Sequence, residues 1–354
     1  MSIKVYFSSL DNPKFNTPLN KIKRLMEHCN IKKMFNKKDL VAIKVHFGEL
    51  GNTSFIRPIL LRPVIEVLKN IKTNPYLTDT NTLYIGMRTN SVDHLHDAAL
   101  NGFNYSTLQV PVIIADGLRG ENTKEIKIES EVLKKVKIAS DIYNADGMIV
   151  ISHFKGHEVS GFGGTIKNIS MGCASRSGKL DMHSQNKPVV KQSKCTVCGL
   201  CVKNCQVKAI IIKEKAVITD KCVGCARCIA ICPEEAIESL WNETSETTQK
   251  KMVDYAFAVT EKFKSKILFI NVLTSISPAC DCYGGNDGPV TEDIGYLAST
   301  DPVALDKASL DLVIKQAGKD PFKEIYPKIN SKIQFDYAVK IGFSNLNYDL
   351  IKIE

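Results

Sequence analysis

The sequence has few aromatic residues and no long apolar segment. Aromatic side chains make up 7% of the 354 residues, and Trp241 is the one tryptophan. No apolar run approaches the roughly 18–20 residues that a membrane-spanning helix needs, and the first residues, MSIKVYFSSLDN, lack the apolar core of a signal peptide. No G-x-G-x-x-G fingerprint follows the first expected strand, so dinucleotide binding has no support. We therefore expect a cytoplasmic protein without a membrane partner.

Charge of one sign is not gathered into any one region. Lys and Arg outnumber Asp and Glu by 47 to 38, which gives a formal net charge of +9. This excess would suit an anionic small molecule, but the lysines are scattered, which argues against nucleic acid as a partner. Because 44% of the residues are hydrophobic, the chain can bury a core, and its length predicts at least two domains.

The twelve cysteines carry more information than the charge does. Eight of them lie in two runs, CTVCGLCVKNC from Cys195 and CVGCARCIAICP from Cys222. Each run has the spacing C-x2-C-x2-C-x3-C, by which bacterial ferredoxins hold two [4Fe–4S] clusters, the fourth cysteine of each run binding the other cluster. The first cluster is thus expected on Cys195, Cys198, Cys201 and Cys232, and the second on Cys222, Cys225, Cys228 and Cys205.

A pair of zinc sites is the alternative for these runs, since C-x2-C pairs also bind Zn²⁺. Zinc sites do not require the third and fourth cysteines at the same offsets in both runs. The first run departs from the ferredoxin pattern at one position, where Gln206 replaces the proline that Pro233 supplies in the second run. Two short strands are expected between the runs, so we predict an inserted ferredoxin-like unit at residues 188–240.

The remaining segments, 1–187 and 241–354, alternate short apolar runs with amphipathic stretches. This pattern predicts an α/β domain with a mostly parallel sheet and helices on both faces. The expected strands are residues 3–7, 41–47, 82–85, 110–115, 148–151, 267–272 and 335–341. The expected helices are residues 22–29, 58–71, 91–102, 246–263 and 301–317, the last capped by Asp301 and ended by Gly318. Cys29 falls on the apolar face of the first helix, while His28, His94 and His96 are expected on helix surfaces.

Polar residues follow three of the expected strands. Because ligands bind beyond the carboxyl ends of parallel strands, we expect these segments to meet at one active site. They contain His46, Glu49, Asn52 and Arg57 after residues 41–47; His153, His157, Lys167, Asn168, Cys173, Lys179 and His183 after residues 148–151; and Cys280, Cys282, Asp287 and Asp293 after residues 267–272.

His153 and His157 are four residues apart, a spacing that would place both on one metal or provide proton donors. The glycines at 161, 163 and 164 precede Lys167, so backbone N–H groups and a cation would hold an anionic group. A mobile loop with solvated histidines is the alternative. Cys280 and Cys282 suit three roles: metal or cluster ligands, a redox disulfide, or nucleophiles. Together with Cys173 they would hold a third cluster; otherwise all three are small buried residues.

The chain resembles the Fe–S centre proteins of domain-of-unknown-function family 362. The motifs that carry the resemblance are VAIKVHFGELGN, TDTNTLYIGMR, ADGMIVISHFKGHEVSGFGGTIKNISMGCASRSGK, the two cysteine runs and ACDCYGGNDGPVTEDIGYLASTDPVALDKA. The resemblance implies a cytoplasmic redox protein of an anaerobe, in which an α/β domain carries a two-cluster ferredoxin unit. It implies no particular substrate.

Three functions are compatible with these residues. In the first, an oxidoreductase receives low-potential electrons from a ferredoxin or flavodoxin and delivers them to Cys280, Cys282, Cys173, His153, His157 and Lys167 on the α/β domain. In the second, the protein is a non-catalytic electron carrier or a partner in Fe–S assembly. The third is a metal-dependent hydrolase or transferase in which the clusters are structural.

Overall fold

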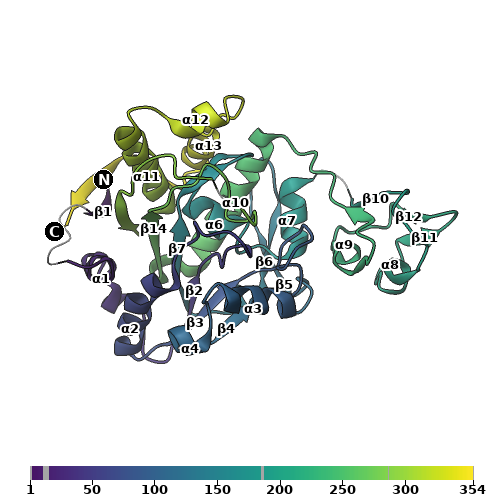
Figure 1. Ribbon diagram of the computed structural model, residues 1–354, viewed down its shortest axis with the longest axis horizontal. Coiled ribbons are helices and arrows are strands. Elements are labelled where there is room, and N and C mark those ends of the chain that lie inside the picture. The colour runs from purple at the N-terminus through teal and green to yellow at the C-terminus, as the bar shows by residue number, and fades with distance from the viewer. Residues whose placement is uncertain (1, 11–15, 185–186, 286, 354) are drawn as a thin grey trace.

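The computed structural model describes residues 2–10, 16–184, 187–285 and 287–353, which form a sheet flanked by helices and a small cysteine-rich extension (Figure 1). The sheet has eight strands in the order β16-β1-β15-β14-β7-β2-β3-β4. Their bounds are β1 Ile3–Ser9, β2 Leu40–Lys44, β3 Asn74–Asp79, β4 Val112–Ile114, β7 Gly147–His153, β14 Ile267–Leu273, β15 Gly295–Ser299 and β16 Tyr348–Lys352. Only β15 runs antiparallel to its neighbours in this sheet, which confirms the expected mostly parallel α/β architecture.

The sheet is buried on both faces. Along β7, Met148 and Val150 belong to one apolar cluster and Ile149 and Ile151 to another, because successive strand side chains point to opposite faces. One face is covered by α6 Thr165–Ser170, α10 Ser245–Phe263, α11 Pro302–Ala317 and α13 Ile333–Lys340, and the other by α1 Pro18–His28, α2 Arg62–Ile71 and α3 Ser91–Leu100. Cys29 is buried in the second cluster, as expected.

Short elements complete the α/β domain. The strands form two hairpins, β5 Thr123–Lys127 with β6 Lys135–Ala139 and β8 Lys155–His157 with β9 Gly161–Gly163. The helices are α4 Tyr105–Leu108, α5 Ser140–Tyr143, α7 Arg176–His183 and α12 Pro321–Ile325, with 3-10 turns at Ile31–Lys33, Pro58–Leu61 and Lys264–Lys266.

The cysteine-rich extension projects from one end of the α/β domain, beyond α7 (Figure 1). Its elements are β10 Val189–Val190, α8 Leu200–Lys203, β11 Ile210–Ile212, β12 Ala216–Ile218, α9 Arg227–Ile231 and β13 Ile237–Glu238. The hairpin of β11 and β12 confirms the two short strands expected between the cysteine runs. Since β10 pairs with β13, the chain leaves and re-enters the α/β domain at neighbouring points, although the limits 188–240 stay a prediction.

Two expected strands are wrong. Residues 82–85 form a loop, and residues 335–341 lie mostly in α13, where Gln334, Phe335, Tyr337 and Ala338 are buried at helical rather than alternating spacing. The structure also contains strands that the apolar pattern did not predict, among them β3, β15 and β16. The caps of α11 are confirmed, because Asp301 Oδ1 accepts hydrogen bonds from two backbone N–H groups of the first turn and Gly318 adopts φ +72°.

Candidate functional site

A cavity of about 720 Å³ lies where β2, β3 and β7 end, a size that suits a small molecule. Its walls come from all three polar segments that follow β2, β7 and β14, which confirms that these segments meet. The lining residues that the sequence analysis named are His46, Glu49, His153, His157, Lys167, Asn168, Lys179, His183 and Cys282. A further wall, formed by residues 79–88 after β3, was not anticipated.

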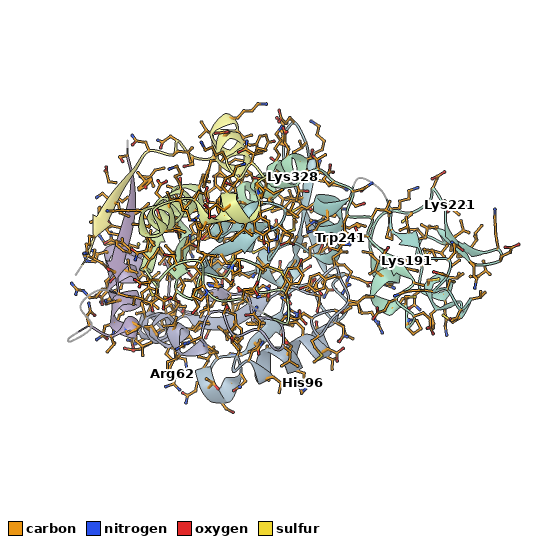
Figure 2. The ribbon with its side chains drawn as sticks, turned by 45° about the horizontal axis from the view of Figure 1, so that its top comes forward. Arg62, His96, Lys191, Lys221, Trp241 and Lys328 are labelled. Carbon is orange, nitrogen blue, oxygen red and sulfur yellow. A yellow bond between two sulfur atoms is a disulfide. The ribbon has the colours of Figure 1, made fainter. Side chains whose placement is uncertain are left out.

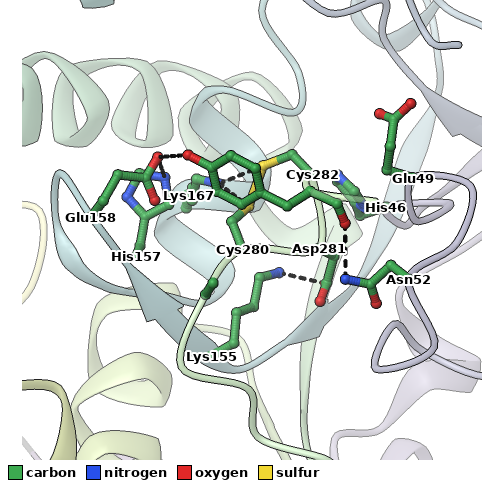
Figure 3. Close-up of a disulfide and its surroundings, with 12 residues drawn as sticks. His46, Glu49, Asn52, Lys155, His157, Glu158, Lys167, Cys280, Asp281 and Cys282 are labelled. Carbon is green, nitrogen blue, oxygen red and sulfur yellow. Dashed lines mark hydrogen bonds and ion pairs between the residues drawn. A yellow bond between two sulfur atoms is a disulfide. The ribbon is translucent and has the colours of Figure 1, made fainter. Parts of the chain in front are cut away.

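Cys280 and Cys282 form a disulfide at the edge of this cavity (Figure 3). Cys280 is 1% exposed, whereas Cys282 is partly exposed and lines the cavity. Lys167 Nζ lies 3.0 Å from Cys280 Sγ and 4.0 Å from Cys282 Sγ. Burial, reinforced by the charge of Lys155, lowers the pKa of Lys167 to about 7. A lysine with such a pKa exchanges protons readily near neutral pH, directly beside the two sulfur atoms.

Asp281, between the two cysteines, is buried, and its carboxylate forms ion pairs with His153 and Lys155. Its carboxylate oxygens lie 2.8 and 3.0 Å from His153 Nδ1, and Lys155 Nζ is 3.0 Å from Oδ2. Burial acts to raise the pKa of Asp281, but His153 and Lys155 outweigh it and hold that pKa well below its usual value. His153 Nε2 lies 3.0 Å from the carbonyl oxygen of Thr274. Both ring nitrogens of His153 are therefore engaged, which leaves neither free to share a metal with His157.

The cysteine loop is also held by close backbone contacts. A Cβ on Gly156 would lie 1.8 Å from the carbonyl oxygen of Pro278, so only glycine allows the β8 strand to approach the loop this closely. On the other side, Asn52 Nδ2 donates to the carbonyl oxygen of Tyr283 at 3.1 Å (Figure 3). The segments after β2 and β7 thus fix the position of the disulfide.

Two lysines of the cavity, the buried Lys179 and the half-buried Lys167, have no carboxylate partner among the described residues. Lys179 donates to the Thr80 hydroxyl at 2.6 Å, and burial lowers its pKa to about 8. Within the described ranges, neither Lys179 nor Lys167 forms an ion pair. Burial also lowers the pKa of His157 well below its usual value and that of His183 to about 3, so both rings are neutral at pH 7. The cavity therefore offers positive charge to an anionic ligand.

Two buried ion pairs in the frame of the cavity were missed from the sequence. Lys44 Nζ lies 2.9 Å from Asp79 Oδ1, and Arg88 Nε lies 2.9 Å from Glu49 Oε2. His94, expected on a helix surface, is fully buried with Nε2 3.9 Å from Asp79 Oδ2, so that prediction was wrong. A lysine inside the apolar strand VAIKVHF was the available signal, because a buried charge needs a partner.

Several predicted site residues lie elsewhere. Cys173 is fully buried, with Sγ 3.8 Å from the carbonyl oxygen of Asn168, and it does not join the disulfide. Arg57, Asp287 and Asp293 are exposed and do not line the cavity. In the described part of the chain, no three His, Cys, Asp or Glu side chains are gathered for one metal ion. The expected grouping of Cys173 with the disulfide cysteines as a third cluster site is therefore not formed.

Four cysteines of the extension line one small cavity. They are Cys195, Cys198, Cys201 and Cys232, the set expected for the first cluster. The fourth cysteine of each run accepts the same type of hydrogen bond, from the backbone N–H four residues later. Ala209 N donates to Cys205 Sγ at 3.2 Å, and Ala236 N donates to Cys232 Sγ at 3.3 Å. The two cysteine runs therefore have the same local geometry at their fourth cysteines.

The extension packs against a wall of the large cavity. Leu83 and Leu180 of the α/β domain share an apolar cluster with Cys201 and Cys228. Leu83 also lines the large cavity, as does Trp241, which lies at the junction of the two units (Figure 2). The apolar cluster that contains Cys201 and Cys228 therefore extends to the wall of the cavity.

Comparison with known proteins identifies the family. The profile described as "Domain of unknown function (DUF362)" matches residues 41–311, and the chain belongs to this family. A ferredoxin from Pyrobaculum islandicum is 31% identical over 74 residues, which cover 20% of this chain and 69% of the ferredoxin. The extension is therefore a ferredoxin-type iron–sulfur domain. No helix in the described ranges is long and apolar enough to cross a membrane.

Two solved structures are similar over most of the chain. The lactate racemase apoprotein from Thermoanaerobacterium thermosaccharolyticum matches with a TM-score of 0.45 and 14% identity over 87% of this chain. A structural-genomics protein from Thermotoga maritima matches with a TM-score of 0.41 and 11% identity over 88% of this chain. The chain spans 57% and 59% of the lengths of these two proteins.

Proposed function

We propose that this protein is an iron–sulfur oxidoreductase whose ferredoxin-type domain exchanges electrons with a substrate in the 720 Å³ cavity. Two [4Fe–4S] clusters bound by the eight cysteines would supply one-electron transfer. Their ligands are Cys195, Cys198, Cys201 and Cys232 for one cluster, and Cys222, Cys225, Cys228 and Cys205 for the other.

The observation that carries this proposal is the position of Leu83. Leu83 belongs to the same buried apolar cluster as Cys201 and Cys228, and it also lines the cavity. A simple electron carrier would not need a cavity of this size next to its cysteines. Arg227 of the ferredoxin-type domain also forms a two-point ion pair with Glu121, which holds the two units together.

The chemistry of the cavity favours an anionic small molecule. Lys167 and Lys179 have no carboxylate partner among the described residues, so a carboxylate or phosphate group would complete their charge balance. In the ferredoxin-type domain, Cys198 and Cys225 are exposed, which suits electron exchange with a ferredoxin or flavodoxin. Oxygen-sensitive clusters of this kind are consistent with the cytoplasm of an anaerobe.

Anaerobic purification followed by metal analysis and electron paramagnetic resonance tests the cluster assignment. Eight irons per chain and two interacting reduced cubanes are expected; zinc in their place would contradict it. The reduced protein is then mixed with a panel of small carboxylate- and phosphate-bearing acceptors, and reoxidation is followed by visible absorbance.

The variant Lys179→Met should abolish reoxidation by the active acceptor while the cluster spectrum stays unchanged. Lys328→Met is the matched control, since Lys328 is an exposed surface lysine (Figure 2) and should behave as the wild type. If every acceptor reoxidises Lys179→Met as fast as the wild type, the cavity takes no part and the protein is an electron carrier.

A further inference from the structure

The Cys280–Cys282 disulfide is asymmetric. Cys280 Sγ is buried and in contact with the Lys167 ammonium, while Cys282 lines the cavity that would hold a substrate. A structural disulfide would gain nothing from an accessible sulfur or from a lysine beside the other sulfur. A redox-active disulfide needs both features. One sulfur must be accessible to the reaction partner, and the other must be stabilised as the thiolate leaving group when the S–S bond breaks.

The surroundings keep the pair in place when the bond opens. Asp281 between the cysteines is fixed by His153 and Lys155, and Gly156 brings the β8 strand against the backbone of the same loop. The two sulfurs therefore stay close after reduction, and the S–S bond can form again without a large conformational change of the loop.

We infer that Cys280 and Cys282 form a redox-active disulfide that the ferredoxin-type domain reduces and that reacts through Cys282 with the substrate in the cavity. The inference rests on the proposed function and deepens it, because it names the group that converts single electrons into a two-electron reaction. Nothing in the family description assigns such a role to these residues.

The reduction is balanced as follows. The S–S bond breaks, two electrons arrive one at a time from a low-potential donor of the ferredoxin class, and two protons enter from solvent. One proton forms the thiol at Cys282. The second either protonates Cys280 or is taken up by the neutral Lys167 amine, whose ammonium then pairs with the Cys280 thiolate. The reverse reaction returns two electrons and two protons to a disulfide or other two-electron acceptor in the cavity.

Thiol labelling of the full protein tests this inference without any turnover assay. The anaerobic holoprotein is treated with reduced methyl viologen, quenched with an alkylating reagent, denatured and digested, and the peptide that contains both cysteines is weighed. We expect no alkyl group before reduction and two after it. Dithiothreitol is used in a parallel sample, because it reduces the pair without the iron–sulfur domain.

The outcomes separate the two proposals. Two free thiols in the protein as isolated without reductant, or a pair that dithiothreitol cannot reduce, overturns the redox disulfide and leaves the proposed function standing. Reduction by dithiothreitol but not by methyl viologen overturns the electron route of the proposed function. Reduction by both reagents supports both.

Substitutions test the asymmetry and the role of Lys167. In Cys280→Ser the remaining Cys282 thiol should be alkylated rapidly in the folded protein, whereas in Cys282→Ser the Cys280 thiol should be protected. Lys167→Met should slow reduction of the disulfide by dithiothreitol at pH 7 severalfold, because the departing Cys280 thiolate loses its cation, and Lys167→Arg should restore it. Cys29→Ser, in the distant core, is the control and should leave all these rates unchanged. Equal rates at the two sulfurs, or no effect of Lys167→Met, would refute the assignment.

Discussion

Replacing the buried carboxylate between the two cysteines tests the electrostatic description of the site. In Asp281→Asn the amide keeps the size of the side chain, and its oxygen can still accept from His153. What is lost is the negative charge 3.0 Å from Lys155 Nζ, in a position where Asp281 is 0% exposed. Breaking one partner of a buried pair typically costs 3–5 kcal/mol, and with the His153 contact retained we expect about 3 kcal/mol.

The expected change in melting temperature follows from the size of the chain. At roughly 2 cal/mol/K per residue, 354 residues give an unfolding entropy of about 0.7 kcal/mol/K, so about 3 kcal/mol lowers the melting temperature by about 4 °C. Circular dichroism of the anaerobic protein measures it. Asp287→Asn, an exposed aspartate of the same segment, should change the melting temperature by less than about 1 °C. The double variant Asp281→Asn/Lys155→Met removes both charges and should be more stable than Asp281→Asn.

The pH dependence gives a second check on the same variant. Because the pKa of Asp281 in the folded protein lies well below its usual value of 3.8, its stabilising effect is fully present above about pH 5 and is lost only as the pH falls below about 4. The difference between wild type and Asp281→Asn should therefore be constant from pH 5 to 8 and shrink in stronger acid. A loss under about 1 kcal/mol, or a difference that vanishes by pH 6, would refute this account.

Three further changes test the loop, the lysine and the domain junction. Gly156→Ala should lower the melting temperature by several degrees, measured by circular dichroism, because its Cβ would lie 1.8 Å from the Pro278 carbonyl oxygen and must displace the loop. Lys167→Met should be more stable than the wild type at pH 6, where the half-buried amine is protonated. This gain should fade between pH 7 and 10, because the pKa of Lys167 is about 7 in the folded protein and 10.5 in the unfolded chain. Melting curves at several pH values measure it. Glu121→Gln should weaken the ion pair with Arg227 by about 1 kcal/mol and raise the rate of limited proteolysis between the units about fivefold.

Matched substitutions control for each of these changes. Gly288→Ala lies in the same segment as the disulfide but has no atom within 4 Å of the added Cβ, so its melting temperature should match the wild type. Lys328→Met should show no pH-dependent gain, because its amine is exposed. Glu125→Gln removes an exposed ion pair with Lys135 and should leave proteolysis unchanged. A control that changes as much as its partner would contradict the corresponding prediction.

The sheet was predictable where its strands are continuous apolar runs. Strands β7 and β14 are buried on both faces and stand out in the sequence, whereas β3, NPYLTD, contains a proline and ends in polar residues. Helix α13 was taken for a strand because its eight residues are too short to show a helical period clearly. Buried polar residues such as Thr78 and Asp79 owe their position to partners on other segments, which no local pattern reveals.

The meeting of the three polar segments was predictable for a topological reason. Parallel strands bring their carboxyl ends to one edge, so residues after β2, β7 and β14 meet although they are far apart in sequence. Which of them touch was not predictable. The sequence offered Cys280 and Cys282 as metal ligands, a redox disulfide or nucleophiles, with Cys173 as a third ligand, and the structure separates the disulfide pair from the buried Cys173. Arg88 was missed because the nearby residues 82–85 were taken for a strand and no polar segment after them was considered.

The charges of the site link anion binding to proton supply. In the frame of the cavity, Asp79 and Glu49 are paired with Lys44 and Arg88. Lys167 and Lys179, with pKa values lowered by burial to about 7 and about 8, are partly deprotonated near neutral pH. An anion that enters the cavity would favour the protonated form of both amines, so that its binding takes up protons from solvent. One of these protons would be held on Lys167, 3.0 Å from Cys280 Sγ. Reduction of the Cys280–Cys282 disulfide would consume protons beside Lys167. A bound anion would therefore place a proton where the proposed reduction uses it.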